Sequence, residues 1–176
     1  MRHLHFTALE VMESLDLSIA PDRILVHLNT FHRKEDLDDL LRTAAGRGVR
    51  YLLVVSGDGG PRLPKLEPED LEVSSKAVTS VELPGYIRSR FPGAFMCGVA
   101  FNQYEPPAHE IEKLERKIAA GAEFVVTQPV IGVDAEVARL LDRRIPIFVE
   151  AWMSRRIELV YECVGVAAPP GGAGAP

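Results

Sequence analysis

Apolar runs alternate with amphipathic segments along most of the chain. Five short runs have the length and composition of buried strands, at residues 24–28, 51–55, 95–101, 124–127 and 145–149. The segments between them are longer and carry apolar residues at helical spacing. Regular alternation of this kind predicts a parallel sheet with its helices packed outside.

The predicted helices have recognisable stripes and stop signals. One stripe consists of Leu37, Leu40, Leu41 and Ala44, and Gly46 and Gly48 follow it as stops. Residues 77–90 are predicted to be helical with a kink or interruption at Pro84-Gly85. Further helices are expected around Ile111, Leu114, Ile118 and Ala119, over residues 135–141, and over residues 6–15 at the start of the chain.

Composition narrows the functional classes. The net charge is -5 with the two signs interspersed, which argues against a general nucleic-acid-binding protein. No apolar run is long enough to cross a bilayer, and the first residues lack the apolar core of a secretory signal, so we expect a cytoplasmic chain without a membrane partner. Cys97 and Cys163 are expected to stay unpaired.

No metal site is predicted. Neither cysteine has a close second thiol or paired histidines. The histidines outside the predicted strands show no ligand spacing and are expected at the surface: His3, His5, His32 and His109.

Polar residues follow four of the predicted strands. The four strand ends read His27-Leu28-Asn29-Thr30, Ser56-Gly57-Asp58, Phe101-Asn102-Gln103 and Thr127-Gln128. In parallel sheets the carboxyl ends of the strands face the crevice that holds ligands. The sequence therefore predicts a small-molecule site at this edge.

Three segments resemble motifs of the methylenetetrahydrofolate reductase family, which are flavin-dependent (β/α)8 barrels that reduce methylenetetrahydrofolate to methyltetrahydrofolate. The run from His27 to Thr30 is similar to the family's His-Leu-Thr-Cys, and Ser56-Gly57-Asp58 to its Arg-Gly-Asp. The run from Lys117 to Gln128 is similar to its Lys-Val-Asp-Ala-Gly-Ala…Thr-Gln unit, which is the most specific of the three. The likeness covers roughly residues 24–150.

The resemblance implies an incomplete parallel (β/α) barrel of TIM type. A chain of 176 residues is short for eight units, which typically need about 250 residues. We expect five to six units, without the first strands and the last. Residues 1–23 would be a lead-in, 24–164 the partial barrel and 165–176 a disordered tail rich in Gly, Ala and Pro. Open edges and an exposed inner face predict a homo-oligomer.

The resemblance also implies a ligand set. The expected cofactor is FAD or another flavin, with NAD(P)H as co-substrate and a folate as substrate. Residues implied to bind the cofactor are His27, Gly57, Asp58, Thr79, Ser80, Ala100, Arg116 and Lys117, the last two at the phosphates. Gln128 matches the glutamine that hydrogen-bonds the pterin, and Asp58 is implied to lie near both flavin and folate.

Some family positions differ here. Ser56 replaces an arginine, Asn102 replaces a proline, and the family's histidine after this segment has no counterpart. The family's general acid, a glutamate on the first strand, also lacks one, and Glu150 and Glu105 are the possible replacements. The catalytic candidates are therefore Asp58, which the resemblance places near flavin and folate, and Glu150.

Each candidate also has a structural interpretation. His27 is compatible with a hydrogen-bonded structural histidine, Asp58 with a turn residue, and Gln128 with a strand-end cap. Arg116 and Lys117 are compatible with a solvated helix face. The alternatives to a flavin-dependent reductase are a catalytically degenerate relative that serves as a flavin- or folate-binding or assembly subunit, and an unrelated parallel α/β enzyme.

Overall fold

The computed structural model describes residues 8–57, 59, 63–131, 135–140, 143–153, 156 and 158–168. The strands are β1 (Leu25–Leu28), β2 (Tyr51–Val54), β3 (Met96–Phe101), β4 (Phe124–Thr127) and β5 (Ile147–Phe148). The helices are α1 (Ala8–Ser14), α2 (Lys34–Gly46), α3 (Glu82–Arg90), α4 (Pro107–Ala120), α5 (Ala135–Leu140) and α6 (Glu158–Val164). Short 3-10 turns lie at Pro21–Arg23 and Pro68–Leu71.

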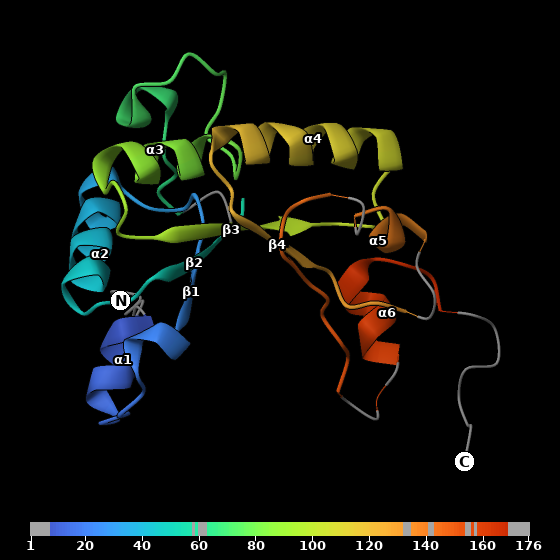
Figure 1. The fold of residues 1–176 in the computed structure, drawn as a ribbon, viewed down its shortest axis with the longest axis horizontal. Coiled ribbons are helices and arrows are strands. Elements are labelled where there is room, and N and C mark those ends of the chain that lie inside the picture. The colour runs from blue at the N-terminus through green and yellow to red at the C-terminus, as the bar shows by residue number, and fades with distance from the viewer. Residues whose placement is uncertain are drawn as a thin grey trace.

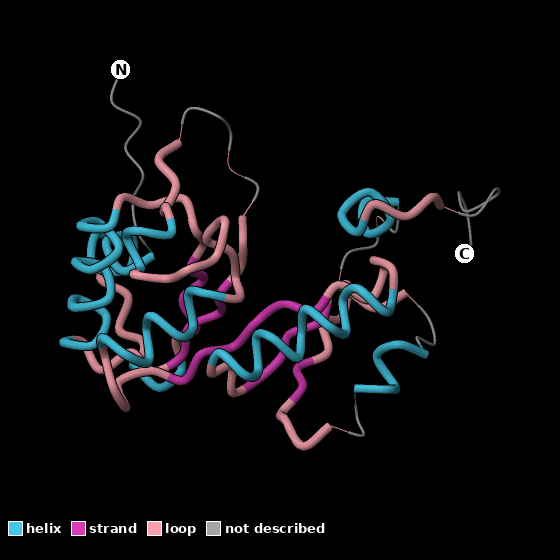
Figure 2. Tube along the Cα trace, turned by 90° about the horizontal axis from the view of Figure 1, so that it is seen from above, coloured by secondary structure: helices cyan, strands magenta, loops and turns pink. Residues whose placement is uncertain are grey.

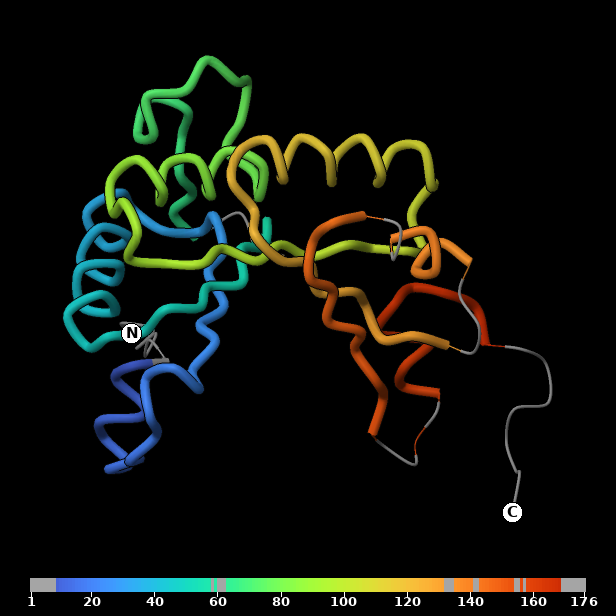
Figure 3. Tube along the Cα trace, viewed as in Figure 1, coloured from blue at the N-terminus to red at the C-terminus, as the bar shows by residue number. Residues whose placement is uncertain are grey.

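The five strands form one parallel sheet in the order β1-β2-β3-β4-β5. The chain colours therefore follow one another from strand to strand across the sheet in Figure 3. Consecutive parallel order with intervening helices is the arrangement of a TIM-type barrel. The alternation of apolar runs correctly predicted the parallel sheet, and the fold is an incomplete barrel, as the resemblance implied.

One face of the sheet, called the outer face here, packs against α2, α3 and α4. Its strand residues are almost fully buried: Val26, Leu28, Leu52, Val54, Cys97, Val99, Phe101 and Val125. Leu41 of α2, Ile87 of α3 and Leu114 of α4 belong to the same core. Figure 1 shows α3 and α4 along this face, and in Figure 2 the long helix α4 lies over the strands and runs along them. Cys97 thus behaves as a buried hydrophobe, and both cysteines are free.

The opposite, inner face would line the interior of a closed barrel. Register aligns His27, Leu53, Gly98 and Phe124 in one row across four strands. Only five strands are formed by the described residues, so this face is partly open, and Phe148 at its far edge is 59% exposed. Phe124 is nonetheless buried, because its ring lies over Gly98 and against Phe148.

Two helix ends follow the glycine signals in the sequence. Gly121 ends α4 in the left-handed region with φ 116°, and its N–H bonds back into the last turn. Gly48 follows α2 with φ 76°. Side chains at these positions would be strained, so glycine is the residue that lets each helix turn into the next strand.

The prediction for residues 77–90 was wrong in two respects. The helix begins only at Glu82, and Pro84 causes no break. Pro84 lies in the first turn, where backbone N–H groups have no intrahelical partner, so its missing donor costs little. Residues 77–81 instead form an irregular stretch with a bend and a turn.

Differences at the two ends of the chain are smaller. Helix α1 ends at Ser14, one residue before the predicted end, and residues 6 and 7 lie outside the described residues. Strand β5 has two residues rather than five. Helix α6 was not predicted, and residues 169–176 of the expected tail lie outside the described residues. No helix in the described ranges combines the length and the apolar character that crossing a membrane requires.

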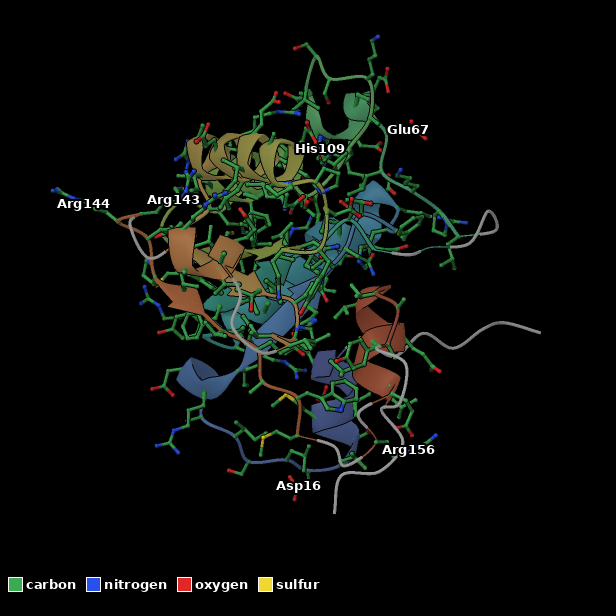
Figure 4. The ribbon with its side chains drawn as sticks, turned by 90° about the vertical axis from the view of Figure 1, so that its right-hand side faces the viewer. Asp16, Glu67, His109, Arg143, Arg144 and Arg156 are labelled. Atoms are coloured by element: carbon green, nitrogen blue, oxygen red, sulfur yellow. The ribbon has the colours of Figure 1, made fainter. Side chains whose placement is uncertain are left out.

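Two of the four histidines expected at the surface fall within the described residues. His109 is exposed at the start of α4, as Figure 4 shows. His32 is half-buried instead, and burial lowers its pKa, although Asp36 acts in the opposite direction. His3 and His5 lie outside the described residues.

Candidate functional site

The candidate site is the edge formed by the carboxyl ends of the strands. All five strands run in the same direction, so the residues that follow them meet at one edge. The polar residues there are Asn29 and Thr30 after β1, Ser56 after β2, Asn102 and Gln103 after β3, Gln128 after β4, and Glu150 after β5. His27 adds an exposed imidazole on the inner face, one residue before the end of β1.

Hydrogen bonds join the ends of β1 and β2 to the segment before α3. The Thr30 hydroxyl donates to the carbonyl oxygen of Ser56 at 2.8 Å. The Ser56 hydroxyl oxygen lies 3.3 Å from that of Ser80 and accepts the Ser80 backbone N–H at 3.3 Å. Ser80 is buried and Ser56 is exposed, so Ser80 supports the residue that faces solvent.

Position 57 requires glycine for two reasons. Its φ is 80°, and a Cβ there would lie 2.9 Å from the Cβ of Asn29 and 3.1 Å from the Phe31 ring. Phe31 also packs over Gly59. The close approach at this glycine is therefore made by the segment after β1. Asp58, the central sequence candidate, lies outside the described residues.

Thr79 is hydrogen-bonded to Glu82, the first residue of α3. Its backbone N–H and its hydroxyl both donate to Glu82 Oε2, at 2.8 and 2.6 Å, and its hydroxyl oxygen accepts the N–H of Val81. The other carboxylate oxygen of Glu82 lies 3.7 Å from Arg116 Nη2 of α4. The Glu82 carboxylate therefore links Thr79 to Arg116 of α4.

Arg116 and Lys117, adjacent in sequence, differ sharply in environment. The Arg116 side chain is 58% exposed, whereas that of Lys117 is 2% exposed. Lys117 Nζ donates to the Ala100 carbonyl at 2.6 Å and lies 3.7 Å from the buried Glu110 carboxylate. Burial lowers the pKa of Lys117 to about 8, while Glu110 acts in the opposite direction. The structure does not bring the two cationic groups together at the surface.

Gln128 is held by the turn that follows β3. Its N–H donates to the carbonyl of Phe101 at 3.1 Å, which continues the pairing of β3 with β4. The Gln103 side chain accepts the same N–H at 3.1 Å and donates to the Gln128 carbonyl at 2.8 Å. The sequence placed Gln103 at a polar strand end but gave it no role, and an amide two residues past a strand was the available signal for this contact.

The two replacement carboxylates are exposed. The Glu150 backbone N–H donates to the Thr127 hydroxyl at 3.1 Å, and its carbonyl accepts the N–H of Val130 at 3.0 Å. Its backbone is thus held at the same edge as Gln128, and its side chain faces solvent. Glu105 is exposed in the turn before α4.

This combination defines a class of protein: a partial TIM-type α/β protein with hydroxyl, amide and carboxylate groups at the carboxyl edge of its sheet. A sequence profile of methylenetetrahydrofolate reductase matches residues 22–141, a span that includes β1 to β4 and α2 to α5. The chain belongs to the methylenetetrahydrofolate reductase family, whose members are oxidoreductases of folate one-carbon metabolism. Glu150 lies beyond the matched residues. No curated protein matches the chain.

Proposed function

We propose that this protein is a flavin-dependent oxidoreductase that reduces 5,10-methylenetetrahydrofolate to 5-methyltetrahydrofolate with NAD(P)H as the electron donor. The observation that carries the proposal is the match to the family over residues 22–141, within which the polar ends of β1 to β4 lie. The free cysteines fit a reducing compartment, and we place the protein in the cytoplasm as part of this proposal.

The chemistry of the residues at the edge fits a flavin, FAD being the first candidate. An isoalloxazine ring needs an apolar surface and hydrogen-bonding groups around its polar rim. The inner face offers half-exposed Ala100 and Val126, and the edge offers the Ser56 hydroxyl and the Gln128 amide. A bound flavin would accept a hydride from the nicotinamide and deliver it to the methylene carbon of the folate.

The residues around the cofactor have distinct proposed roles. His27, Gly57 and Asp58 would lie against the ring system, and the segment with Thr79 and Ser80 near its adenosine portion. Arg116 is the exposed cation suited to the pyrophosphate, since a guanidinium binds phosphate oxygens in pairs. Lys117 would act indirectly, because its buried ammonium group holds the carbonyl of Ala100 near the end of β3.

On the substrate side, Gln128 would bind the pterin, because an amide both donates and accepts along one edge. Opening the methylene bridge breaks one C–N bond, and the nitrogen that leaves must receive a proton. Glu150 is the first candidate for supplying it, because its exposed carboxylate follows β5 at the same edge, and Glu105 is the second. Asp58 would orient the pterin together with Gln128.

The first test is the absorbance of freshly purified protein between the near ultraviolet and the blue, followed by NAD(P)H-dependent reduction of menadione. We expect a flavin spectrum and turnover. We also expect Gln128→Leu to impair folate reduction more than menadione reduction, whereas His109→Gln, on the exposed start of α4, leaves both unchanged. A colourless protein that gains no absorbance when flavin is added would refute the proposal.

The open inner face favours a second candidate, a catalytically degenerate binding or assembly subunit. Leu25 and Phe148 at the two edges of the sheet are 42% and 59% exposed. Apolar surface of this kind favours self-association, so we propose a homo-oligomer. Robust flavin-dependent turnover would exclude the degenerate subunit, and a monomer in light scattering at micromolar concentration would exclude the homo-oligomer.

A further inference from the structure

We propose that Gln103 is a positioning residue that fixes the backbone of Gln128, and thereby the amide that meets the folate. The inference rests on the proposed function of this site. Gln103 lies in the turn between β3 and α4, is 6% exposed, and has no assigned role in the resemblance that identified the other candidates.

The Gln103 amide reinforces the last backbone hydrogen bond between β3 and β4, in which the Gln128 N–H donates to the Phe101 carbonyl at 3.1 Å. Strand β3 ends at Phe101 and β4 at Thr127, so Gln128 is the first residue beyond the regular pairing. Gln103 Oε1 accepts its N–H at 3.1 Å, and Gln103 Nε2 donates to its carbonyl at 2.8 Å. A side-chain amide has one donor and one acceptor side, so it can bind both backbone groups of a single residue.

Tyr104 holds two further residues of the segment after β4, Pro129 and Ile131. Its hydroxyl donates to the Pro129 carbonyl at 2.6 Å and accepts the N–H of Ile131 at 3.1 Å. Gln103 and Tyr104 together, called the turn clamp here, therefore hold backbone groups of three residues after β4. No other side chain of the described residues is seen to bond these groups.

The turn clamp is itself anchored to α4. The Asn102 side chain accepts the N–H of Tyr104 at 3.1 Å, and the Asn102 N–H donates to Glu110 Oε1 at 3.1 Å. Glu110 is 1% exposed and lies next to buried Lys117. Burial and the hydrogen bond to α4 hold the turn in place. Gln103 and Tyr104 can therefore position the segment that follows β4.

Loss of this support should weaken folate use more than it weakens the fold. A misplacement of about 1 Å in a positioning group can reduce turnover by about 100-fold. Gln103→Leu keeps the approximate size of the side chain and removes both hydrogen bonds. We expect it to raise the KM for methyltetrahydrofolate about 10-fold to 100-fold, with flavin retained.

The experiment has two readouts. Amide exchange tests the contact itself, and folate kinetics test its effect on the proposed function. The first is amide hydrogen exchange of Gln128 and Ile131 in protein without folate, where Gln103→Leu and Tyr104→Phe respectively should speed exchange at least about 10-fold. The second is folate kinetics for Gln103→Leu, Gln128→Ala and the double variant. Ser14→Ala is the control, because it removes a side-chain to backbone hydrogen bond from α1.

A positioning role predicts that the double variant is no worse than Gln128→Ala, because Gln103 acts only through Gln128. Additive effects, or exchange unchanged in Gln103→Leu, would overturn the inference. If the exchange result holds but the wild-type protein neither binds nor converts folate, the proposed function fails and the assignment of Gln103 to folate positioning falls with it. The structural clamp alone would then be established.

Discussion

Replacing Gly98 with alanine should destabilise the protein out of proportion to the single methyl group added. Gly98 lies in the row that crosses the inner face, and the Phe124 ring lies directly above it. An added Cβ would come within 2.0 Å of Phe124 Cε2 and 2.2 Å of Cζ. Carbon atoms in contact are normally about 3.5 to 4.0 Å apart, so the ring has to move.

The cost follows from what the ring would lose. Phe124 is 4% exposed, and its ring centroid lies 5.4 Å from that of Phe148 in an edge-to-face arrangement. Overpacking typically costs about 1 to 3 kcal/mol, and an aromatic pair contributes about 0.5 to 1.5 kcal/mol beyond its burial. We expect Gly98→Ala to lower the free energy of unfolding by about 2 to 4 kcal/mol, which corresponds to a fall in Tm of about 5 to 15 °C for a chain of this size.

Urea and thermal unfolding followed by circular dichroism measure this effect. Gly46→Ala is the matched control, because Gly46 is helical and no atom lies within 4 Å of an added Cβ. Alanine there should be neutral or stabilise by about 0.5 to 1 kcal/mol. Phe124→Leu should partly rescue Gly98→Ala by freeing space. Strict additivity of the two changes, or a Gly98→Ala variant as stable as the wild type, would refute the packing argument.

Three further predictions concern titratable groups. The folded-state pKa of Lys117, about 8, lies below its ordinary 10.5, so the cost of burying its charge is fully present below pH 8 and is relieved as pH rises toward 10.5. The stability of the wild type relative to Lys117→Met should therefore increase between pH 7.5 and 10 in urea titrations, and a constant difference would contradict this. Burial opposes ionisation of Asp38, but hydrogen bonds from Lys34 and Tyr86 outweigh it and lower its pKa. Asp38→Asn should consequently destabilise by about 1 to 3 kcal/mol at pH 7, by chemical denaturation, and by less once the pH falls through that lowered pKa. Burial raises the pKa of Cys97 to about 12, while Cys163 is exposed, so one thiol should react with Ellman's reagent in the folded protein and two in urea. Retention of a fast-reacting thiol in Cys163→Ser would disprove this last assignment.

The strands and most helices were predictable because their signals are local. Strand β4 occupies the residues that its apolar run indicated, and α4 ends where Gly121 follows its stripe. The start of α3 was not predictable in the same way. Thr79, Glu82 and Pro84 form an ordinary helix start, and the pattern of apolar residues before them suggested that the helix began earlier.

The candidate site was only partly predictable. Position at a strand end identified Ser56 and Gln128, because the parallel alternation already implied one shared edge. The part played by Gln103 was missed because its partner lies 25 residues away, and only the register of β3 against β4 brings the two together.

The sequence by itself determined which segments are strands and their parallel arrangement, since side-chain period and glycine stops act within a few residues. Tertiary structure decided the environments. Arg116 and Lys117 are neighbours with the same charge, yet one guanidinium is exposed and one ammonium is buried against Ala100 and Glu110. Successive residues of a helix point about 100° apart, so the packing of α4 on the sheet, rather than residue type, determines which cation a ligand can reach.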